Sequence, residues 1–261
     1  MCTILFAYDC HPRYKLVAAA NRDEFYQRPT APAAFWTDNP DILGGRDLKE
    51  GGTWMGITTG GRFAGLTNYR DPSSFRPEAK SRGHLVTNYL STNVAPETYA
   101  ANLVDGGSAY NGFNLLMATN ESMYYYSNRE KIARKVPAGV HGLSNALLNT
   151  PWPKVSKGIR ALTDLLQNNE IKAEQLFAMM TDREQPDDQD LPRTGVSLEM
   201  ERMLAPTFVI SPKYGTCLTT VILVERNHKV QFWERSFKDG QPDNWEEVNY
   251  QFATIRGVLR K

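Results

Sequence analysis

Cys2-Thr3-Ile4-Leu5-Phe6-Ala7-Tyr8 is the stretch from which the fold of this chain can be worked out. β-branched and aromatic residues in a short run predict a β-strand that begins at the second residue. Methionine aminopeptidase normally removes Met1 before a residue as small as cysteine, which would leave a thiol and a free α-amine on Cys2. Their ordinary pKa values are about 8.5 and about 8, so the amine can accept the thiol proton. The stretch fits an N-terminal nucleophile, the alternative being that the chain starts with this pair by chance.

A second strand is expected at residues 14–20, and the short Asp- and Pro-containing connector before it predicts a hairpin. Asn21-Arg22-Asp23-Glu24 follows directly. If the two strands pair, the end of the second lies beside Cys2. Asp23 would then accept a hydrogen bond from the Cys2 ammonium, and Arg22 would lower the pKa of the thiol. The alternative is a polar loop that makes surface ion pairs.

The rest of the chain alternates between runs of strands and runs of helices. Residues 21–52 are rich in Pro, Gly and Asp and are expected to form long functional loops. Short connections between most strands predict antiparallel pairing. Helices are expected at 79–90, 96–103, from Pro153 onward and at 173–180, an exposed loop at 181–193, and further strands at 53–58, 62–67, 113–118, 123–127, 216–224, 229–234 and 248–252. This order predicts an α+β fold of two mainly antiparallel sheets flanked by helix layers.

Composition narrows the class of protein. The chain has 261 residues, of which 41% are hydrophobic and 23% charged, and its net charge is +1. These values are typical of a soluble globular protein, and a near-neutral charge argues against nucleic acid as a partner. No apolar run reaches the length of a membrane span, and the N-terminus does not resemble a secretory signal. Three cysteines in an odd set favour a reducing compartment, so a cytoplasmic location is expected. The absence of a Gly/Ser linker predicts a single domain over 1–261.

Two further segments carry candidate site residues. Gly142-Leu143-Ser144-Asn145 is either an ordinary loop before an N-capped helix or a segment in which the Asn145 amide donates to a developing oxyanion. Gly51-Gly52-Thr53-Trp54 is either a turn or a ligand-contacting backbone with Trp54 as a wall, and Asn68-Tyr69-Arg70 would face the same cleft. The four histidines lack metal-ligand spacing, so no metal site is expected, and His141 is of interest because it adjoins the Asn145 segment.

These motifs occur together in an order that resembles one family. Met1-Cys2-Thr3, Asn21-Arg22-Asp23-Glu24, Gly51-Gly52-Thr53-Trp54, Asn68-Tyr69-Arg70 and the segments 142–145 and 150–155 all match it, as do Tyr214-Gly215-Thr216, Thr219-Thr220 and Glu234-Arg235-Ser236. The chain resembles the NRDE family, also called the transport and Golgi organisation protein 2 family, nearly from end to end. The resemblance implies that residues 1–261 form a single domain of this family.

The family is more remotely similar to choloylglycine hydrolases and penicillin acylases. That similarity implies a four-layer αββα fold of the N-terminal-nucleophile hydrolase type, with Cys2 as nucleophile, Asp23 as the orienting carboxylate and Asn145 as the oxyanion donor. Two departures stand out. Ala20 occupies the place of an arginine of the remote relatives, and Cys217 occupies the place of an arginine that usually follows Tyr-Gly-Thr in the family. A positive charge beside the nucleophile is therefore expected to be missing at position 217.

The family resemblance implies a soluble protein that binds and traffics haem or a similar apolar anionic metabolite, with haem-acceptor proteins as partners and no required cofactor. The expected ligand-binding residues are Asn21, Arg22, Trp54, Asn68, Tyr69, Arg70 and His141. The alternative is a Cys2-dependent amide hydrolase that acts on a small acyl-amide. A third reading is a scaffold for membrane-traffic factors, in which the cleft is a relic.

Overall fold

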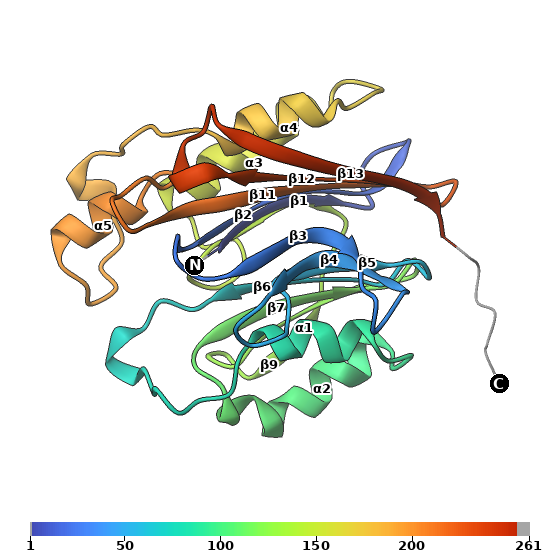
Figure 1. Cartoon of the computed structure of the whole chain (residues 1–261), viewed down its shortest axis with the longest axis horizontal. Coiled ribbons are helices and arrows are strands. Elements are labelled where there is room, and N and C mark those ends of the chain that lie inside the picture. The colour runs from blue at the N-terminus through green and yellow to red at the C-terminus, as the bar shows by residue number, and fades with distance from the viewer. Residues whose placement is uncertain (1, 255–261) are drawn as a thin grey trace.

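Two antiparallel sheets pack face to face in this protein, and helices cover their outer faces (Figure 1). The computed structural model describes residues 2–254. Short hairpins join most neighbouring strands, and a short connection lets the chain return only in the antiparallel direction. The predicted α+β architecture of two mainly antiparallel sheets is confirmed.

The six-stranded sheet has the order β10-β1-β2-β11-β12-β13. The register of β1 on β2 places Cys2 opposite Arg22 and Tyr8 opposite Leu16. The end of β2 therefore lies beside the start of β1, as the expected hairpin requires. The strands of this sheet are β1 (Cys2–Tyr8), β2 (Tyr14–Phe25), β10 (Gly139–Leu143), β11 (Tyr214–Glu225), β12 (Lys229–Phe237) and β13 (Trp245–Ala253).

The seven-stranded sheet keeps the order of the chain, because each strand pairs with the next one. Its fourth and fifth strands are connected by a long segment that carries two helices. Its strands are β3 (Thr30–Phe35), β4 (Ile42–Asp47), β5 (Met55–Thr58), β6 (Phe63–Asn68), β7 (Phe113–Ala118), β8 (Met123–Ser127) and β9 (Ile132–Lys135).

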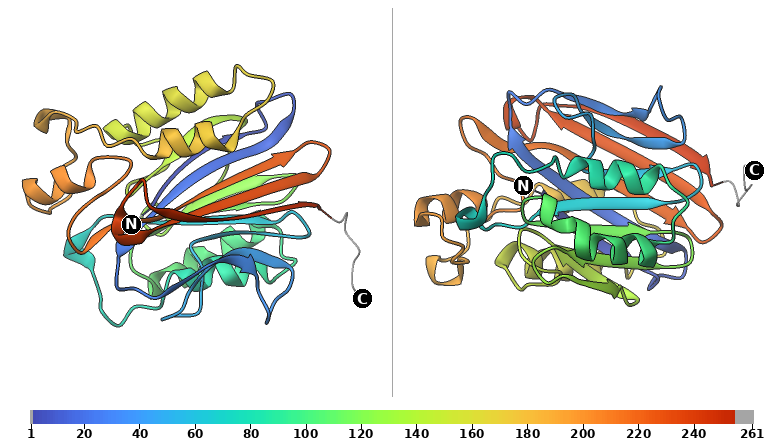
Figure 2. Two further views of the ribbon diagram at one scale, coloured as in Figure 1. Left: turned by 45° about the horizontal axis from the view of Figure 1, so that its top comes forward. Right: turned by 90° about the horizontal axis from the view of Figure 1, so that it is seen from below.

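Helices complete the four layers (Figure 2). α1 (Gly83–Leu90) and α2 (Pro96–Gly106) cover the seven-stranded sheet, and α3 (Pro153–Leu165) and α4 (Ala173–Met180) cover the six-stranded sheet. A short helix, α5 (Leu198–Leu204), lies at the end of the molecule where β1 begins (Figure 1). The αββα order that the family resemblance implies is thus observed.

Strand β1 shows why the sheets stack in this order. Successive side chains of a strand point to opposite faces. Ile4 and Phe6 pack in the core between the two sheets, whereas Leu5 and Ala7 pack in a second core beneath α3 and α4. All four are buried, so β1 is apolar on both faces and must lie inside the molecule. Cys2 shares the face of Ile4 and Phe6 and therefore points between the sheets.

Glycines let α3 approach the six-stranded sheet closely. A Cβ atom at Gly158 of α3 would lie 2.4 Å from a methyl carbon of Leu5, and one at Gly142 of β10 would lie 2.7 Å from Val155. Both distances are shorter than a van der Waals contact, so a Cβ atom at either position would force the neighbouring side chain to move. This close approach fixes the start of α3 relative to β1 and β10.

Gly158→Ala is expected to destabilise the protein by about 1–3 kcal/mol, because the added methyl group overpacks a buried contact with Leu5. The control is Gly106→Ala at the end of α2, where a Cβ atom meets no atom within 4 Å. That substitution should be neutral or slightly stabilising, since alanine favours the helix by up to about 1 kcal/mol. Urea unfolding of both variants gives the comparison. Equal stability of the two variants would contradict the close packing of α3.

The structure corrects the expectation that residues 21–52 form long loops. The first five extend β2, and β3 and β4 lie within the remainder. Pro32 and the pair Gly44-Gly45 lower the intrinsic strand preference of β3 and β4, and pairing with neighbouring strands overrides it. Two more expectations were incomplete: the segment containing Gly142 ends a strand, β10, rather than forming a loop, and β9 and α5 were not expected.

Candidate functional site at Cys2

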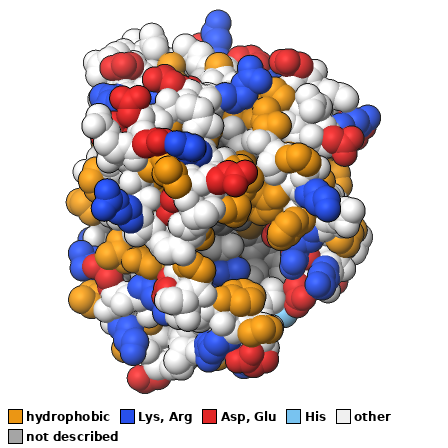
Figure 3. Space-filling view, turned by 90° about the vertical axis from the view of Figure 1, so that its left-hand side faces the viewer, with side chains coloured by type: hydrophobic (Ala, Val, Ile, Leu, Met, Phe, Trp, Pro, Cys, Tyr) orange, Lys and Arg blue, Asp and Glu red, His pale blue; other side chains and the backbone are white. Residues whose placement is uncertain are grey.

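A cavity of about 350 Å³ opens between the sheets at the end where β1 begins and β2 ends. Figure 3 shows this end of the molecule hollowed, with hydrophobic and basic side chains around the hollow. Nine of the twenty lining residues carry charged side chains, so the cavity is strongly polar. The lining residues include Cys2, Arg22, Asp23, Glu24, Arg28, Asp47, Trp54, Asn68, Phe75, Lys80 and Arg82.

Cys2 lies at the inner end of this cavity with 7% of its surface exposed. Burial raises the pKa of its thiol, and the neighbouring carboxylate of Asp23 acts in the same direction. The guanidinium of Arg22 lowers this pKa, as the sequence suggested, but burial has the larger effect. The thiol is therefore protonated near neutral pH, and a nearby base is required before it can act as a nucleophile.

Arg22 faces the core between the sheets and is nearly buried. Its guanidinium lies 4.7 Å from the ring centroid of Trp54, within the range of a cation–π contact. Glu24 and Asp47 lie 3.8 and 3.6 Å from the same guanidinium. The charge of Arg22 is thus already balanced within the cavity wall, and Trp54 forms part of that wall.

Asp23 occupies the next position of β2 and is 1% exposed. The hydroxyl of Thr216 in β11 donates to Asp23 Oδ1 at 2.8 Å, and the hydroxyl of Tyr214 donates to its main-chain oxygen at 3.0 Å. Burial raises the pKa of the Asp23 carboxyl, and the strongest opposing influence is the ammonium of Lys154. Because β1 and β2 are antiparallel with Cys2 opposite Arg22, the main-chain nitrogen of Cys2 lies on the side of Asp23.

Asn145 follows the end of β10, and its side chain bonds to the start of β1 and to the end of β6. Its Nδ2 donates to the main-chain oxygen of Asn68 at 3.0 Å and to that of Cys2 at 3.5 Å. Its Oδ1 lies 3.5 Å from an Arg70 guanidinium nitrogen. The amide of Asn145 therefore holds the end of β6 against the start of β1. Asn68 itself lines the cavity, as Cys2 does.

Besides Asn145, four further predicted site residues lie outside the cavity lining. The amide of Asn21 is bonded to the main-chain oxygens of Met180 and Thr207, because alternation along β2 turns it toward α4. Tyr69 lies beneath the guanidinium of Arg129. The remaining two are also engaged elsewhere: His141 stacks on Phe6 and bonds to Pro137 and Asn149, and Arg70 forms an ion pair with Glu201.

Arg70 and Glu201 form a buried ion pair. Their closest atoms are 2.5 Å apart, and the side chains are 5% and 4% exposed. The main-chain nitrogen and the hydroxyl of Thr194 both donate to the other carboxylate oxygen of Glu201. Arg70 also lies over the ring of Trp152. The pair connects α5 to the Asn145 segment, since the Arg70 main-chain nitrogen donates to the main-chain oxygen of Asn145 at 2.7 Å.

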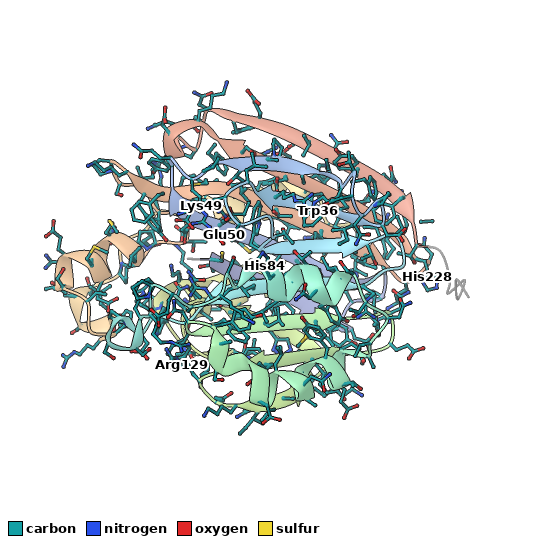
Figure 4. The ribbon with its side chains drawn as sticks, turned by 60° about the horizontal axis from the view of Figure 1, so that its bottom comes forward. Trp36, Lys49, Glu50, His84, Arg129 and His228 are labelled. Carbon is teal, nitrogen blue, oxygen red and sulfur yellow. The ribbon has the colours of Figure 1, made fainter. Side chains whose placement is uncertain are left out.

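Sequence reasoning missed four basic residues that line this cavity, one of which is Arg28. Lys80 and Arg82 precede α1 and line the cavity, and Arg82 interacts electrostatically with Cys2. Lys49 also lines it and lies with Glu50 close to His84, whose ring is 2.7 Å from the main-chain oxygen of Glu50 (Figure 4). No local pattern marks Lys80 or Arg82, because the pairing of distant strands brings them to Cys2.

Cys217 lies at an irregularity of β11 where the register on β2 shifts. Its thiol is directed at the main-chain oxygen of Glu24, 3.4 Å away, and burial raises its pKa to about 11. Position 217 therefore contributes no positive charge, as the sequence implied. Arg22 and Arg82 nevertheless bring positive charge to the neighbourhood of Cys2.

Among residues 2–254, no three His, Cys, Asp or Glu side chains converge as metal ligands would. Within the same residues no helix has the length and apolar character needed to cross a membrane.

Two sheets stacked between helix layers, with a cysteine at the start of the first strand, define a fold like that of the N-terminal-nucleophile hydrolases. A conjugated bile acid hydrolase from Clostridium perfringens, solved as a mutant, superposes with a TM-score of 0.51, covering 100% of this chain and 99% of that one. The two sequences are 8% identical, so this likeness concerns the fold alone.

The chain belongs to the Transport and Golgi organisation 2 family, whose sequence profile matches residues 1–239. The human Transport and Golgi organization protein 2 homolog is 38% identical over 97% of this chain and 99% of its own length. Transport and Golgi organization protein 2 of Drosophila melanogaster is 27% identical over 99% of this chain and 100% of its own length. The resemblance seen in the motifs is therefore confirmed over nearly the whole chain.

Proposed function

We propose that this protein binds an amphipathic anion in the Cys2 cavity, haem or an acyl-type carboxylate, and passes it to an acceptor protein. The observation that carries the proposal is the pair of cations at the cavity. Lys80 and Arg82 line it, and among residues 2–254 neither has a carboxylate within ion-pair distance. Arg22 and Arg28, by contrast, are balanced by Glu24 and Asp47. An anionic ligand group would supply the partner that Lys80 and Arg82 lack.

The cavity also has an apolar rim, formed by Phe75, which lines the cavity and is 62% exposed. An exposed aromatic group beside a polar cavity suits a ligand with a charged head and an apolar body. Haem and acyl carboxylates share that chemistry, and a cavity of about 350 Å³ accommodates the head rather than the whole of either.

Cys2 adds a feature specific to haem. Among residues 2–254, it is the one residue of the cavity lining whose side chain is a common axial ligand of haem iron. Because burial raises its pKa, the thiol binds iron weakly near neutral pH, which suits a carrier that must release its cargo. We place the transfer in the cytoplasm, because Cys2, Cys10 and Cys217 are unpaired thiols and thiols of this kind persist in reducing compartments.

Arg82→Met is expected to weaken binding of an amphipathic anion by about 10- to 100-fold, the contribution of one charge-assisted hydrogen bond. Binding is measured by the Soret change on haem titration and by displacement of a fluorescent long-chain carboxylate. Lys135→Met, which removes an exposed charge from β9 outside the cavity, is the matched control and should bind normally. Phe75→Ser should weaken long-chain carboxylates more than short ones, because Phe75 belongs to the apolar rim.

The proposal fails if the purified protein shows no saturable change with either probe and no transfer of haem to an apo-haemoprotein. Saturable binding that Arg82→Met and Lys80→Met leave unchanged would place the ligand outside the Cys2 cavity.

A second candidate function is hydrolysis of a small acyl-amide by Cys2. The specific observation in its favour is that Cys2, Asp23 and Asn68 line one cavity and that the Asn145 amide lies 3.5 Å from the main-chain oxygen of Cys2. In this mechanism the Cys2 α-amine accepts the thiol proton, Asp23 orients that amine, and the amides of Asn68 and Asn145 stabilise the oxyanion. Asn145 would have to exchange its bonds to the main chain for the oxyanion.

Intact-mass spectrometry of the native protein tests this second candidate, because the α-amine of Cys2 exists only after Met1 is removed. Retention of Met1 would rule the mechanism out. Removal of Met1, together with stoichiometric labelling of Cys2 by iodoacetamide near neutral pH, would support it. Amidase activity that persists in Cys2→Ala would eliminate it.

A further inference from the structure

Lys154 is the most deeply buried lysine near the Cys2 site and had no role in the sequence analysis. It lies in the first turn of α3 and is 5% exposed. Its Nζ donates to the main-chain oxygens of Leu204 and Pro206 at 2.8 and 3.2 Å. Among residues 2–254 no carboxylate oxygen lies within 4.0 Å of this ammonium. A buried ammonium bound only to neutral carbonyls requires a counter-charge close by.

Segment 204–209 links Lys154 to Asp23. Lys154 holds one end of this segment through Leu204 and Pro206. At the other end, the main-chain nitrogen of Val209 donates to the Thr216 hydroxyl at 2.9 Å, and that hydroxyl donates to Asp23. The close packing of α3 through Gly142 and Gly158 fixes the position of Lys154 relative to this arrangement.

Asp23 and Lys154 are electrostatic partners. After burial, Lys154 is the strongest influence on the pKa of Asp23, and Asp23 is the strongest influence on that of Lys154. Burial lowers the pKa of Lys154 to about 8, even with Asp23 acting to raise it. The other charged or titratable groups around this pair are Cys2 of β1, Arg22 and Glu24 of β2, Tyr26 after β2, Tyr214 and Cys217 of β11, Arg70 after β6 and Glu201 of α5.

We propose that Lys154 is a positioning residue of the Cys2 site, which acts from α3 by supplying the counter-charge that keeps Asp23 a carboxylate beside Cys2. The role rests on chemistry at Cys2, the second of the proposed functions. An ionised Asp23 can hold an ammonium at Cys2, and a charged Lys154 is the strongest of the cations that favour this ionised form. Each member of the pair therefore depends on the other: removal of either charge takes away the strongest charged influence on the other, and burial then favours its neutral form.

The test is the pH profile of Cys2 alkylation by iodoacetamide, followed by peptide mass spectrometry. Lys154→Met, Asp23→Asn and the double variant all leave a site with neither charge. Their three profiles should coincide and differ from the wild-type profile by roughly three- to tenfold in rate near pH 7, as a change of half to one unit in thiol pKa produces. Alkylation needs no substrate, so this test can be interpreted even if no substrate or ligand of the protein is found.

Two controls accompany the measurement. The exposed thiol of Cys10 lies at the other end of β1 and reports on the same molecule, so its alkylation rate should be unchanged. Lys157→Met removes a charge from the same helix, where Lys157 pairs with Asp182 and Glu184 at the surface, and should leave the wild-type profile.

The proposal is overturned if Lys154→Met keeps the wild-type profile, or if its effect and that of Asp23→Asn multiply in the double variant. Should Lys154→Met unfold the protein, thermal unfolding decides instead. Addition of Asp23→Asn should then restore folding, because the pair is neutralised together, and a double variant less stable than Lys154→Met would overturn the proposal.

Discussion

Arg70→Met is expected to destabilise the protein by about 3–5 kcal/mol, because it leaves the Glu201 carboxylate buried without its partner. The ion pair measures 2.5 Å, and both side chains are about 95% buried, being 5% and 4% exposed. In a protein of this size such a loss lowers the unfolding midpoint by roughly 6–15 °C. Thermal unfolding followed by circular dichroism measures it.

Arg202, the residue after Glu201 in α5, provides a matched control. Arg202 pairs with Asp188 at the same distance, 2.5 Å, but the side chains are 53% and 52% exposed. Exposed pairs contribute about 0–1 kcal/mol, so Arg202→Met should change stability little. A double variant, Arg70→Met with Glu201→Leu, should recover much of the loss, because no unpaired charge remains. Similar effects of Arg70→Met and Arg202→Met would contradict a role for burial.

The second large effect concerns Glu234, a buried carboxyl that links the two sheets. Glu234 lies in β12 and is 1% exposed. Its Oε1 accepts from the main-chain nitrogen of Ala33 in β3 at 2.7 Å, and its Oε2 accepts from the Thr220 hydroxyl at 3.0 Å. Burial raises the pKa of Glu234 from 4.5 to about 7 in the folded protein.

Because the folded protein holds this proton more tightly than the unfolded chain does, Glu234 lowers stability as pH rises from about 4.5 to about 7. The full difference corresponds to about 3 kcal/mol. Glu234→Gln keeps an acceptor for Ala33 and gains a donor for Thr220, yet cannot ionise. The variant should match the wild type near pH 4.5 and exceed its stability by about 3 kcal/mol above pH 7. Urea unfolding across this range tests it, and parallel curves for the two proteins would refute it.

The sequence carried enough information for the sheets but not for all of their edges. The bounds of β1, β7 and β8 were predicted correctly, because short apolar runs with turn residues on both sides leave little choice of structure. β3 and β4 were missed because proline and glycine mask their strand character, which only pairing with neighbours restores.

The residues of the candidate site also fall into those that the sequence could indicate and those that it could not. Cys2, Arg22, Asp23, Trp54 and Asn68 stand at strand ends that the hairpins bring together, and the structure places all five at one cavity. Arg82 and Lys154 come from segments whose position depends on the packing of whole helices, so no local pattern could indicate them. The roles given to these residues remain predictions.

The position of Cys2 has a practical consequence for anyone who produces the protein. Cys2 begins β1 and lines the cavity, with strands β10 and β2 on either side. A purification tag fused in front of Cys2 would start at the cavity lining and compete with a small molecule for this space. Recombinant protein for binding assays should therefore carry its tag at the C-terminus.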